Sequence, residues 1–227
     1  MTTAEPNGPP EPQLLDTSVV QALDWVDALR EAETPFQWTD ERMAELEALY
    51  GRRHANELLD LGTLYTRFES GDGYPWLVSQ AALLEIDRLR DRKGYRLRHM
   101  FDFLAGHQDD WHCDAYPGVA LGTLRPSRPW SPSRLVLRGL GVEHVDDIVA
   151  DTGPLGFLPD EGDRRLVRDA LLANVPAILT LDRRTLWSRR DGLRSLGIDV
   201  FQPSELLGMY RTHWAQDAML RQRQRCR

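Results

Sequence analysis

The ten residues ILTLDRRTLW (178–187) decide the expected fold, because a short apolar run ends there at a single carboxylate. The run 178–181 has the length of a buried strand, and Asp182 follows it directly. A second stretch, QLLDTSVV (13–20), has the same arrangement and ends its apolar part at Asp16. In open parallel sheets, functional groups gather beyond the carboxyl ends of the strands. If the two strands are neighbours, the two carboxylates meet at one edge of the sheet.

The alternation of apolar runs and amphipathic segments predicts an α/β fold with a parallel sheet. In the first half we expect a strand over 13–16, a helix over 18–31, helical structure from 39 to 69, a strand over 76–78, and helices over 80–92 and 95–105. In the second half we expect a helix over 160–173, a strand over 177–181, a helix over 184–196, a strand over 198–201 and a helix over 204–209.

The chain of 227 residues has the length of one large domain, and its composition is that of an ordinary globular protein. Residues 1–12 are rich in Pro and Gly and predict a disordered tail, and 211–227 predict a basic C-terminal tail. Between them, 13–210 is expected to form the domain. An added helical segment near 33–72 and a loop-rich insertion near 107–150 interrupt it.

Charge, cysteine content and hydropathy exclude several classes of protein. The net charge of −7 argues against a general nucleic-acid coat. Cys113 and Cys226 have no metal or redox spacing, so we expect a reducing compartment and no disulfide framework. No apolar run approaches the roughly 18 residues of a membrane span, and no targeting signal is evident. These features predict a cytoplasmic protein without a membrane partner.

Helical periodicity indicates that a third acidic residue, Asp163, lies near Asp16 and Asp182. Positions three, four, seven and eight residues after Asp163 are Leu166, Val167, Ala170 and Leu171. This apolar stripe places Asp163 on the core-facing side of the first turn, where the helix dipole favours its charge. Asp160 competes for the same role, although it precedes the helix proper.

Glu85 is the fourth candidate, and its choice over Asp87 stays open. The helical neighbours of Glu85 are mostly apolar, and those of Asp87 do not favour it more. Periodicity alone therefore cannot decide between the two residues. Each acid taken singly is also compatible with a cap, a turn or a solvated side chain.

Several carboxylates in one cavity repel one another unless a cation neutralises them. Mg²⁺ and Mn²⁺ prefer oxygen ligands and are the natural partners of such a group. A site of this kind activates water and positions a phosphodiester for in-line attack. The hydroxyls of Thr17, Ser18 and Thr180 are expected to support the carboxylates, the ligand waters or the phosphate oxygens.

Four stretches together resemble the PIN-domain ribonucleases: LLDTSVV, LLEIDRL, DRRLVRDALLANVPAILTLDRRTL and GIDVFQPSELL. The similarity covers roughly residues 12–32, 76–106 and 155–209. It implies a three-layer fold around a central parallel sheet. It assigns four residues to a Mg²⁺ or Mn²⁺ site, with Ser18 and Thr180 as supporting hydroxyls: Asp16, Glu85, Asp163 and Asp182.

The same resemblance implies cleavage of single-stranded RNA that leaves 5′-phosphate and 3′-hydroxyl ends. Such an enzyme can be the toxin of a toxin–antitoxin pair, with a cognate antitoxin and a second copy of the chain as partners besides RNA. Glu85 lies 69 positions after Asp16, and Asp163 lies 78 positions after Glu85. Both spacings exceed those of a compact family member, which is why we expect two insertions.

Other features suggest RNA contacts or different functions. Four arginines beside the acids are expected to bind RNA phosphates, although a solvated helix face fits them equally: Arg164, Arg165, Arg183 and Arg184. The stretch HQDDWHC (107–113) has no standard zinc spacing. A haloacid-dehalogenase-like site needs Asp-x-Asp, and Ser18 stands at the second position. A PIN-like module that binds RNA or protein without catalysis is the alternative from another class.

Overall fold

The computed structural model describes residues 8–32, 37–70, 74–89, 91–115 and 134–225. Its centre is a parallel sheet of four short strands in the order β2-β1-β3-β4. The strands are β1 (Gln13–Leu15), β2 (Trp76–Leu77), β3 (Ala177–Leu179) and β4 (Asp199–Phe201). Leu15 of β1 pairs in register with Leu179 of β3. The strands that precede Asp16 and Asp182 are therefore neighbours, which is the condition under which the sequence predicts that the two acids meet.

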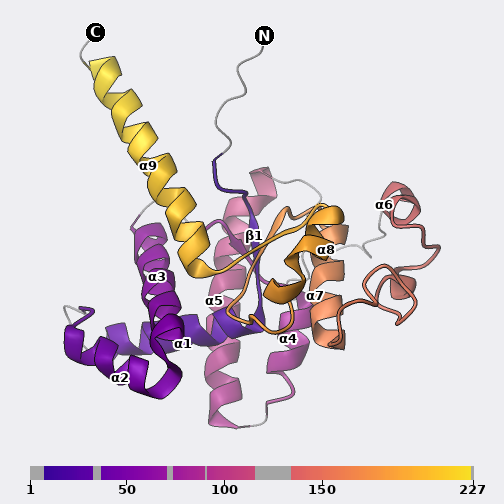
Figure 1. The fold of residues 1–227 in the computed structure, drawn as a ribbon, viewed down its shortest axis with the longest axis horizontal. Coiled ribbons are helices and arrows are strands. Elements are labelled where there is room, and N and C mark those ends of the chain that lie inside the picture. Colours follow the sequence, from indigo (N-terminus) through magenta and orange to yellow (C-terminus); the bar gives the residue numbers. More distant parts are fainter. Residues whose placement is uncertain (1–7, 33–36, 71–73, 90, 116–133, 226–227) are drawn as a thin grey trace.

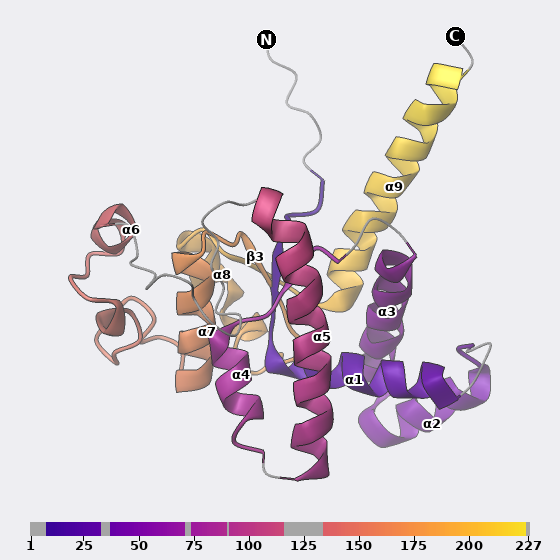
Figure 2. The same ribbon diagram turned by 180° about the vertical axis from the view of Figure 1, so that it is seen from behind.

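Helices flank this sheet in the described part of the chain (Figures 1 and 2). They are α1 (Thr17–Ala32), α2 (Asp40–Tyr50), α3 (Arg52–Glu69), α4 (Gln80–Ile86), α5 (Arg92–Ala115), α6 (Arg134–Gly139), α7 (Glu161–Leu172), α8 (Arg190–Ser195) and α9 (Pro203–Arg225), with short 3-10 turns η1 (Val145–Ile148) and η2 (Trp187–Arg189). This arrangement confirms an α/β fold with a flanked parallel sheet. No helix among the described residues is both long and apolar enough to cross a bilayer.

Side chains alternate between the two faces of the sheet, as the strand geometry requires. One face buries Leu14, Leu77, Ile178 and Val200 against apolar residues of α4, α7 and α8. The other face buries Leu15, Trp76 and Leu179 against α1, α3, α5 and α9. Because both faces are covered, the strands are mostly apolar, and Gln13 and Asp199 are polar residues at the strand starts.

The added helical segment consists of two helices instead of the continuous pattern expected over 39–69. Thr39 caps α2 by accepting a hydrogen bond from the backbone N–H of Arg42 at 3.3 Å. Gly51 ends the helix with φ of +82°, a conformation that favours glycine, and α3 begins at the next residue. The turn folds α2 back against α3 (Figure 1).

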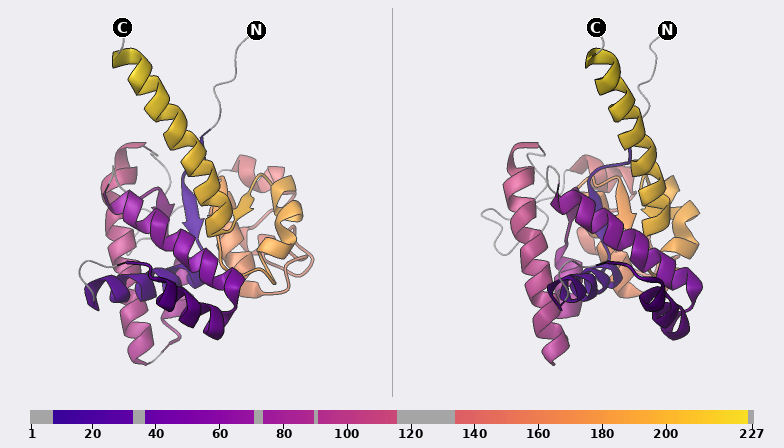
Figure 3. Two further views of the ribbon diagram at one scale, coloured as in Figure 1. Left: turned by 60° about the vertical axis from the view of Figure 1, so that its left-hand side comes forward. Right: turned by 90° about the vertical axis from the view of Figure 1, so that its left-hand side faces the viewer.

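Several predicted boundaries are wrong. The helix over 80–92 ends at Ile86, and only 190–195 of the helix over 184–196 is α-helical. Residues 107–115, expected as loop, continue α5, while 116–133 lie outside the described residues. The expected C-terminal tail is also helical, because α9 runs to Arg225 and extends away from the sheet (Figure 3). Of the predicted tail 1–12, residues 1–7 lie outside the described residues.

Glu57 anchors α9 to the added helices. This buried residue of α3 accepts hydrogen bonds from the backbone N–H and the hydroxyl of Ser204, both at 2.8 Å. The bonds satisfy a donor in the first turn of α9, where a negative charge is favourable.

We expect Glu57→Ala to lower the free energy of unfolding by about 1–3 kcal/mol, because it leaves those donors without their charged acceptor. Urea denaturation measures this loss. Glu47→Ala is the matched control, since the Glu47 side chain is 41% exposed on the neighbouring helix. A change of about 0.5 kcal/mol or less is expected there. Equal losses in the two variants would contradict the anchoring role.

Candidate functional site

Asp16 lies at the carboxyl end of β1, where the neighbouring strand holds it in place. Its backbone N–H donates to the carbonyl of Leu179 at 3.0 Å, which continues the sheet by one bond. Its carboxylate is buried, and Oδ2 accepts hydrogen bonds from the hydroxyls of Ser18 at 2.5 Å and Thr180 at 2.7 Å. A carboxylate thus occupies the edge of the sheet at which strand ends converge.

Two hydroxyls connect Asp16 to the segment that carries Asp182. Thr180 Oγ1 donates to Asp16 and accepts from the backbone N–H of Asp182 at 2.9 Å. Ser18 Oγ accepts from the backbone N–H of Leu181 at 3.1 Å. The predicted support by Ser18 and Thr180 therefore corresponds to real contacts that fix the backbone between the two acids.

Asp182 is held by the turn that follows it. Its Oδ1 accepts from the backbone N–H groups of Arg184 at 2.7 Å and Thr185 at 3.3 Å, and its Oδ2 accepts from the Thr185 hydroxyl at 2.7 Å. This is the pattern of an aspartate that closes a turn on itself. It also fixes the direction of the carboxylate at the end of β3.

Glu85, and not Asp87, faces this site. Its Oε2 accepts a hydrogen bond from the hydroxyl of Thr17 at 2.6 Å, which brings α4 against the start of α1. Asp87 instead forms an ion pair with Arg98 at 2.9 Å on the surface. The structure thus decides an alternative that periodicity leaves open.

Asp160 and Asp163 take different places at the start of α7. Asp160 is the N-cap, and its Oδ1 accepts from the backbone N–H of Asp163 at 3.1 Å. Asp163 Oδ2 is buried and has no hydrogen-bond partner. The apolar stripe of α7 (Leu166, Val167 and Ala170) is buried as predicted, which turns Asp163 inward.

These acids are hereafter called the acidic cluster (Asp16, Glu85, Asp160, Asp163 and Asp182), and the pKa is raised in three of them. Burial raises the pKa of Asp163 to about 7 although the hydroxyl of Thr185 opposes the rise, and the charges of Asp16, Asp160 and Asp182 add to it. Burial also raises the pKa of Asp16 and of Glu85, although hydrogen bonds to hydroxyls oppose it in both cases. A cation is the partner that such a group lacks.

The donor set fits a divalent cation in chemistry, with carboxylate oxygens and one buried oxygen without a partner. Within the described residues, however, no three such side chains are arranged to ligate one ion together. The hydroxyls of Thr17, Ser18, Thr180 and Thr185 instead donate hydrogen bonds to one oxygen each of Asp16, Glu85 and Asp182.

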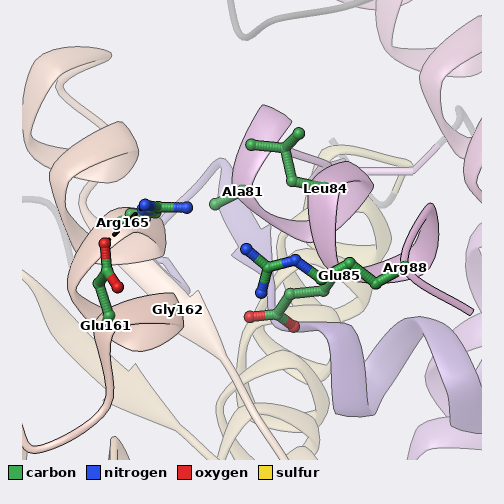
Figure 4. A pocket seen from close by; sticks show the side chains of 7 residues that line it. All are labelled: Ala81, Leu84, Glu85, Arg88, Glu161, Gly162 and Arg165. Carbon is green, nitrogen blue, oxygen red and sulfur yellow. Dashed lines mark hydrogen bonds and ion pairs between the residues drawn. The ribbon is translucent and has the colours of Figure 1, made fainter.

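A small cavity of about 30 Å³ adjoins the cluster between α4 and the start of α7 (Figure 4). Its lining includes Glu85 and two arginines, Arg88 and Arg165. A Cβ atom on Gly162 would overlap Glu85 Oε1 and would lie 2.9 Å from Asp160 Oδ1. Glycine at this position therefore lets the Glu85 carboxylate approach the first turn of α7.

We expect Gly162→Ala to displace Glu85 while the fold is retained, because the overlap is with the end of a flexible side chain. If Glu85 serves the proposed chemistry, the rate of RNA cleavage falls about tenfold, in line with the cost of small misplacements. Single-turnover cleavage and thermal unfolding, measured together, test this. Gly106→Ala is the control, since a Cβ there meets no atom within 4 Å. A full cleavage rate in Gly162→Ala would contradict the placement.

The four arginines predicted to bind RNA do not share one environment. Arg164 is buried and pairs with Asp151 at 2.6 Å, so the prediction that it faces RNA is wrong. Arg165 pairs with Glu161 at 2.5 Å beside the small cavity. Arg183 lies over the ring of Trp187 at 4.7 Å, and Arg184 is exposed.

Sequence reasoning missed Thr185, Gly162 and Arg88. A threonine three residues after Asp182 is a turn signal that could have indicated Thr185. Gly162 and Arg88 act across two helices, and nothing in their local sequence indicates this. In the stretch 107–113, the ring of His107 contacts Phe103, and the side chains that follow lie outside the described residues.

No family model matches this chain, and neither the curated proteins nor the solved structures contain a significant match to it.

Proposed function

We propose that the protein is a PIN-like endoribonuclease that uses Mg²⁺ or Mn²⁺ to hydrolyse single-stranded RNA. The observation that carries the proposal is the convergence of Asp16, Glu85, Asp163 and Asp182 from four distant parts of the chain. Burial without a neutralising group costs free energy, and sites that carry perturbed carboxylates are often functional. Arg88 offsets part of the charge of Glu85, but its effect is smaller than that of burial.

The fold supports the same proposal. The strand order β2-β1-β3-β4, with Asp16 after β1 and Asp182 after β3, places both acids beside the central pair of strands. Ligand sites of parallel sheets lie outside such carboxyl ends. The quoted resemblance to PIN-domain ribonucleases adds the reaction and the assignment of the third and fourth acids.

In this mechanism each residue has a defined task. Asp16, Glu85, Asp163 and Asp182 are the candidate ligands of the cation, which would supply water activation and charge neutralisation at the phosphodiester. The Thr180 and Ser18 hydroxyls keep Asp16 oriented, and the Thr185 hydroxyl does the same for Asp182. Arg88 and Arg165 beside Glu85 supply positive charge for a phosphate that approaches the cluster.

The direct test is incubation of the purified chain with 5′-labelled single-stranded RNA in Mn²⁺, Mg²⁺ or a chelator. The proposal predicts metal-dependent cleavage, abolished by the chelator, with 5′-phosphate and 3′-hydroxyl product ends. Absence of cleavage in both metals, with RNA binding retained, would instead support a PIN-like binding module without activity. That alternative is favoured by one observation, the hydroxyls that already occupy the carboxylate oxygens.

A further inference from the structure

A groove of about 470 Å³ begins beside the acidic cluster. Ser18 and Asp182 form its inner end. Its floor is α1, one wall is the start of α5, and the other wall is the junction of α2 and α3. Figure 2 shows α1 passing between α5 and the α2–α3 pair. The volume lies within the range of roughly 300–1,000 Å³ that is typical of ligand pockets.

The outer part of this groove carries two basic side chains and aromatic rings together with Asp24, whereas Asp182 lies at its inner end. Lys93 and Arg96 line the wall formed by α5. The Lys93 ammonium contacts the amide oxygen of Gln21 at 3.5 Å, a neutral partner that leaves its charge free to attract an anion. Arg96 pairs with Asp24 at 2.9 Å but remains 48% exposed, and its guanidinium has further donors.

The opposite wall presents two flat rings. Tyr50 is 57% exposed at the end of α2, and its ring lies 5.6 Å from that of His54, at an interplanar angle of 52°. Both rings border the groove. Exposed aromatic rings beside basic side chains are the two elements that single-stranded nucleic acids require, since the rings stack on bases and the cations bind phosphates.

We infer that this groove, one wall of which is formed by the added helices, binds the single-stranded RNA that flanks the scissile bond. Tyr50 and His54 stack a base, and Lys93 and Arg96 bind the adjacent phosphates. The inference rests on the proposed function, because it assumes that the RNA strand reaches the acidic cluster at the inner end of the groove and is cleaved there. It explains what the helical segment near 33–72 adds to the domain.

Binding without metal tests the inference independently of catalysis. Fluorescence anisotropy of a labelled oligouridylate, measured in chelator, gives the Kd of wild type and variants. We expect Tyr50→Ala to raise the Kd about tenfold, the typical loss of one stacked base. Lys93→Ala should raise it several-fold and reduce its salt dependence. The controls are Tyr95→Ala, with a tyrosine 78% exposed outside the groove, and Arg52→Ala, with a side chain 84% exposed.

Lys93 also offers a direct probe, because it is the only lysine in the sequence. Acetylation of this amine by an N-hydroxysuccinimide ester, followed by mass spectrometry, should slow when the oligouridylate is bound. Equal acetylation with and without saturating RNA, together with an unchanged Kd in Tyr50→Ala, would overturn the inference.

The two proposals fail in different ways. Wild-type protein that binds RNA through Tyr50 and Lys93 but cleaves none in Mn²⁺ or Mg²⁺ would support the groove and refute the ribonuclease. Wild-type protein that cleaves RNA, with an unchanged KM in Tyr50→Ala and Lys93→Ala, would refute the groove alone. A groove that binds a protein partner, with no measurable affinity for RNA, would also refute the inference.

Discussion

Replacement of Asp16 or Asp182 by asparagine should reduce metal-dependent RNA cleavage by on the order of 10²–10³-fold, the loss typical of removing one preorganised electrostatic group. Asparagine has nearly the same shape, and its amide oxygen can still accept from Ser18 and Thr180 at position 16. The variant therefore removes charge while it preserves most of the geometry. Single-turnover cleavage in Mn²⁺ measures the effect.

Asp191→Asn is the matched control, because the Asp191 side chain is 93% exposed and its nearest cation, on Arg194, lies 3.9 Å away. Thermal unfolding supplies a second readout. In chelator, Asp16→Asn should unfold no lower than wild type, since a repulsive buried charge has been removed. Added Mn²⁺ should raise the melting temperature of wild type but not of the variant, because only a folded state that binds the ion gains from it. Undiminished cleavage in Asp16→Asn and Asp182→Asn would point to a contaminating nuclease.

The positions of Asp16 and Asp182 could be predicted because they depend on local signals. Each follows a short apolar strand, and parallel strands place their carboxyl ends at one edge. Asp163 was predictable for a similar reason, since the apolar stripe of α7 specifies which side of its first turn is buried. These inferences need only the helical or strand periodicity of the apolar residues and the direction of the parallel strands.

Glu85 could not be chosen over Asp87, because the choice depends on tertiary contacts. The hydroxyl of Thr17 and the absence of a side chain at Gly162 decide the orientation of Glu85, and both belong to other helices. Arg164 was misjudged for the same reason. Its local sequence resembles a solvated helix face, yet the loop that carries Asp151 covers it.

The groove and the length of α9 could not be predicted from the local sequence either. Tyr50 and Lys93 are separated by 43 positions, and only the packing of α2 and α5 around α1 brings both into the lining of one groove. The basic C-terminal segment lacks an apolar stripe that would mark it as helical, but it continues a helix that Glu57 anchors at its start.

Asp163→Asn should stabilise the metal-free protein at alkaline pH while it abolishes most of the cleavage. The folded state raises the pKa of Asp163 from 3.8 to about 7, mainly through burial. The folded chain therefore holds a proton that the unfolded chain has released between about pH 4 and pH 7. The stability contributed by this group is complete below the unfolded pKa and is lost as the pH rises through the folded value. Asparagine carries no charge at any pH and avoids the loss.

Urea denaturation of the two proteins in chelator, at a series of pH values from 4 to 8, measures this difference. At pH 8 the variant should be more stable by about 1–2 kcal/mol, after a discount for solvent screening of a partly exposed group. Near pH 4 the two should agree, because wild-type Asp163 is then protonated when folded. Asp191→Asn, with a side chain that is 93% exposed, is the matched control.

Mn²⁺ separates electrostatic repulsion from a packing effect in the same experiment. If the ion binds the acidic cluster, it favours the ionised carboxylate, so wild type should gain stability above pH 7 and the variant should gain much less. A difference between the proteins that stays constant from pH 4 to 8 would show that Asp163 titrates normally. A variant that is more stable than wild type and still cleaves RNA at the wild-type rate would remove Asp163 from the proposed mechanism. In a functional site, a destabilising charge is expected to contribute to activity.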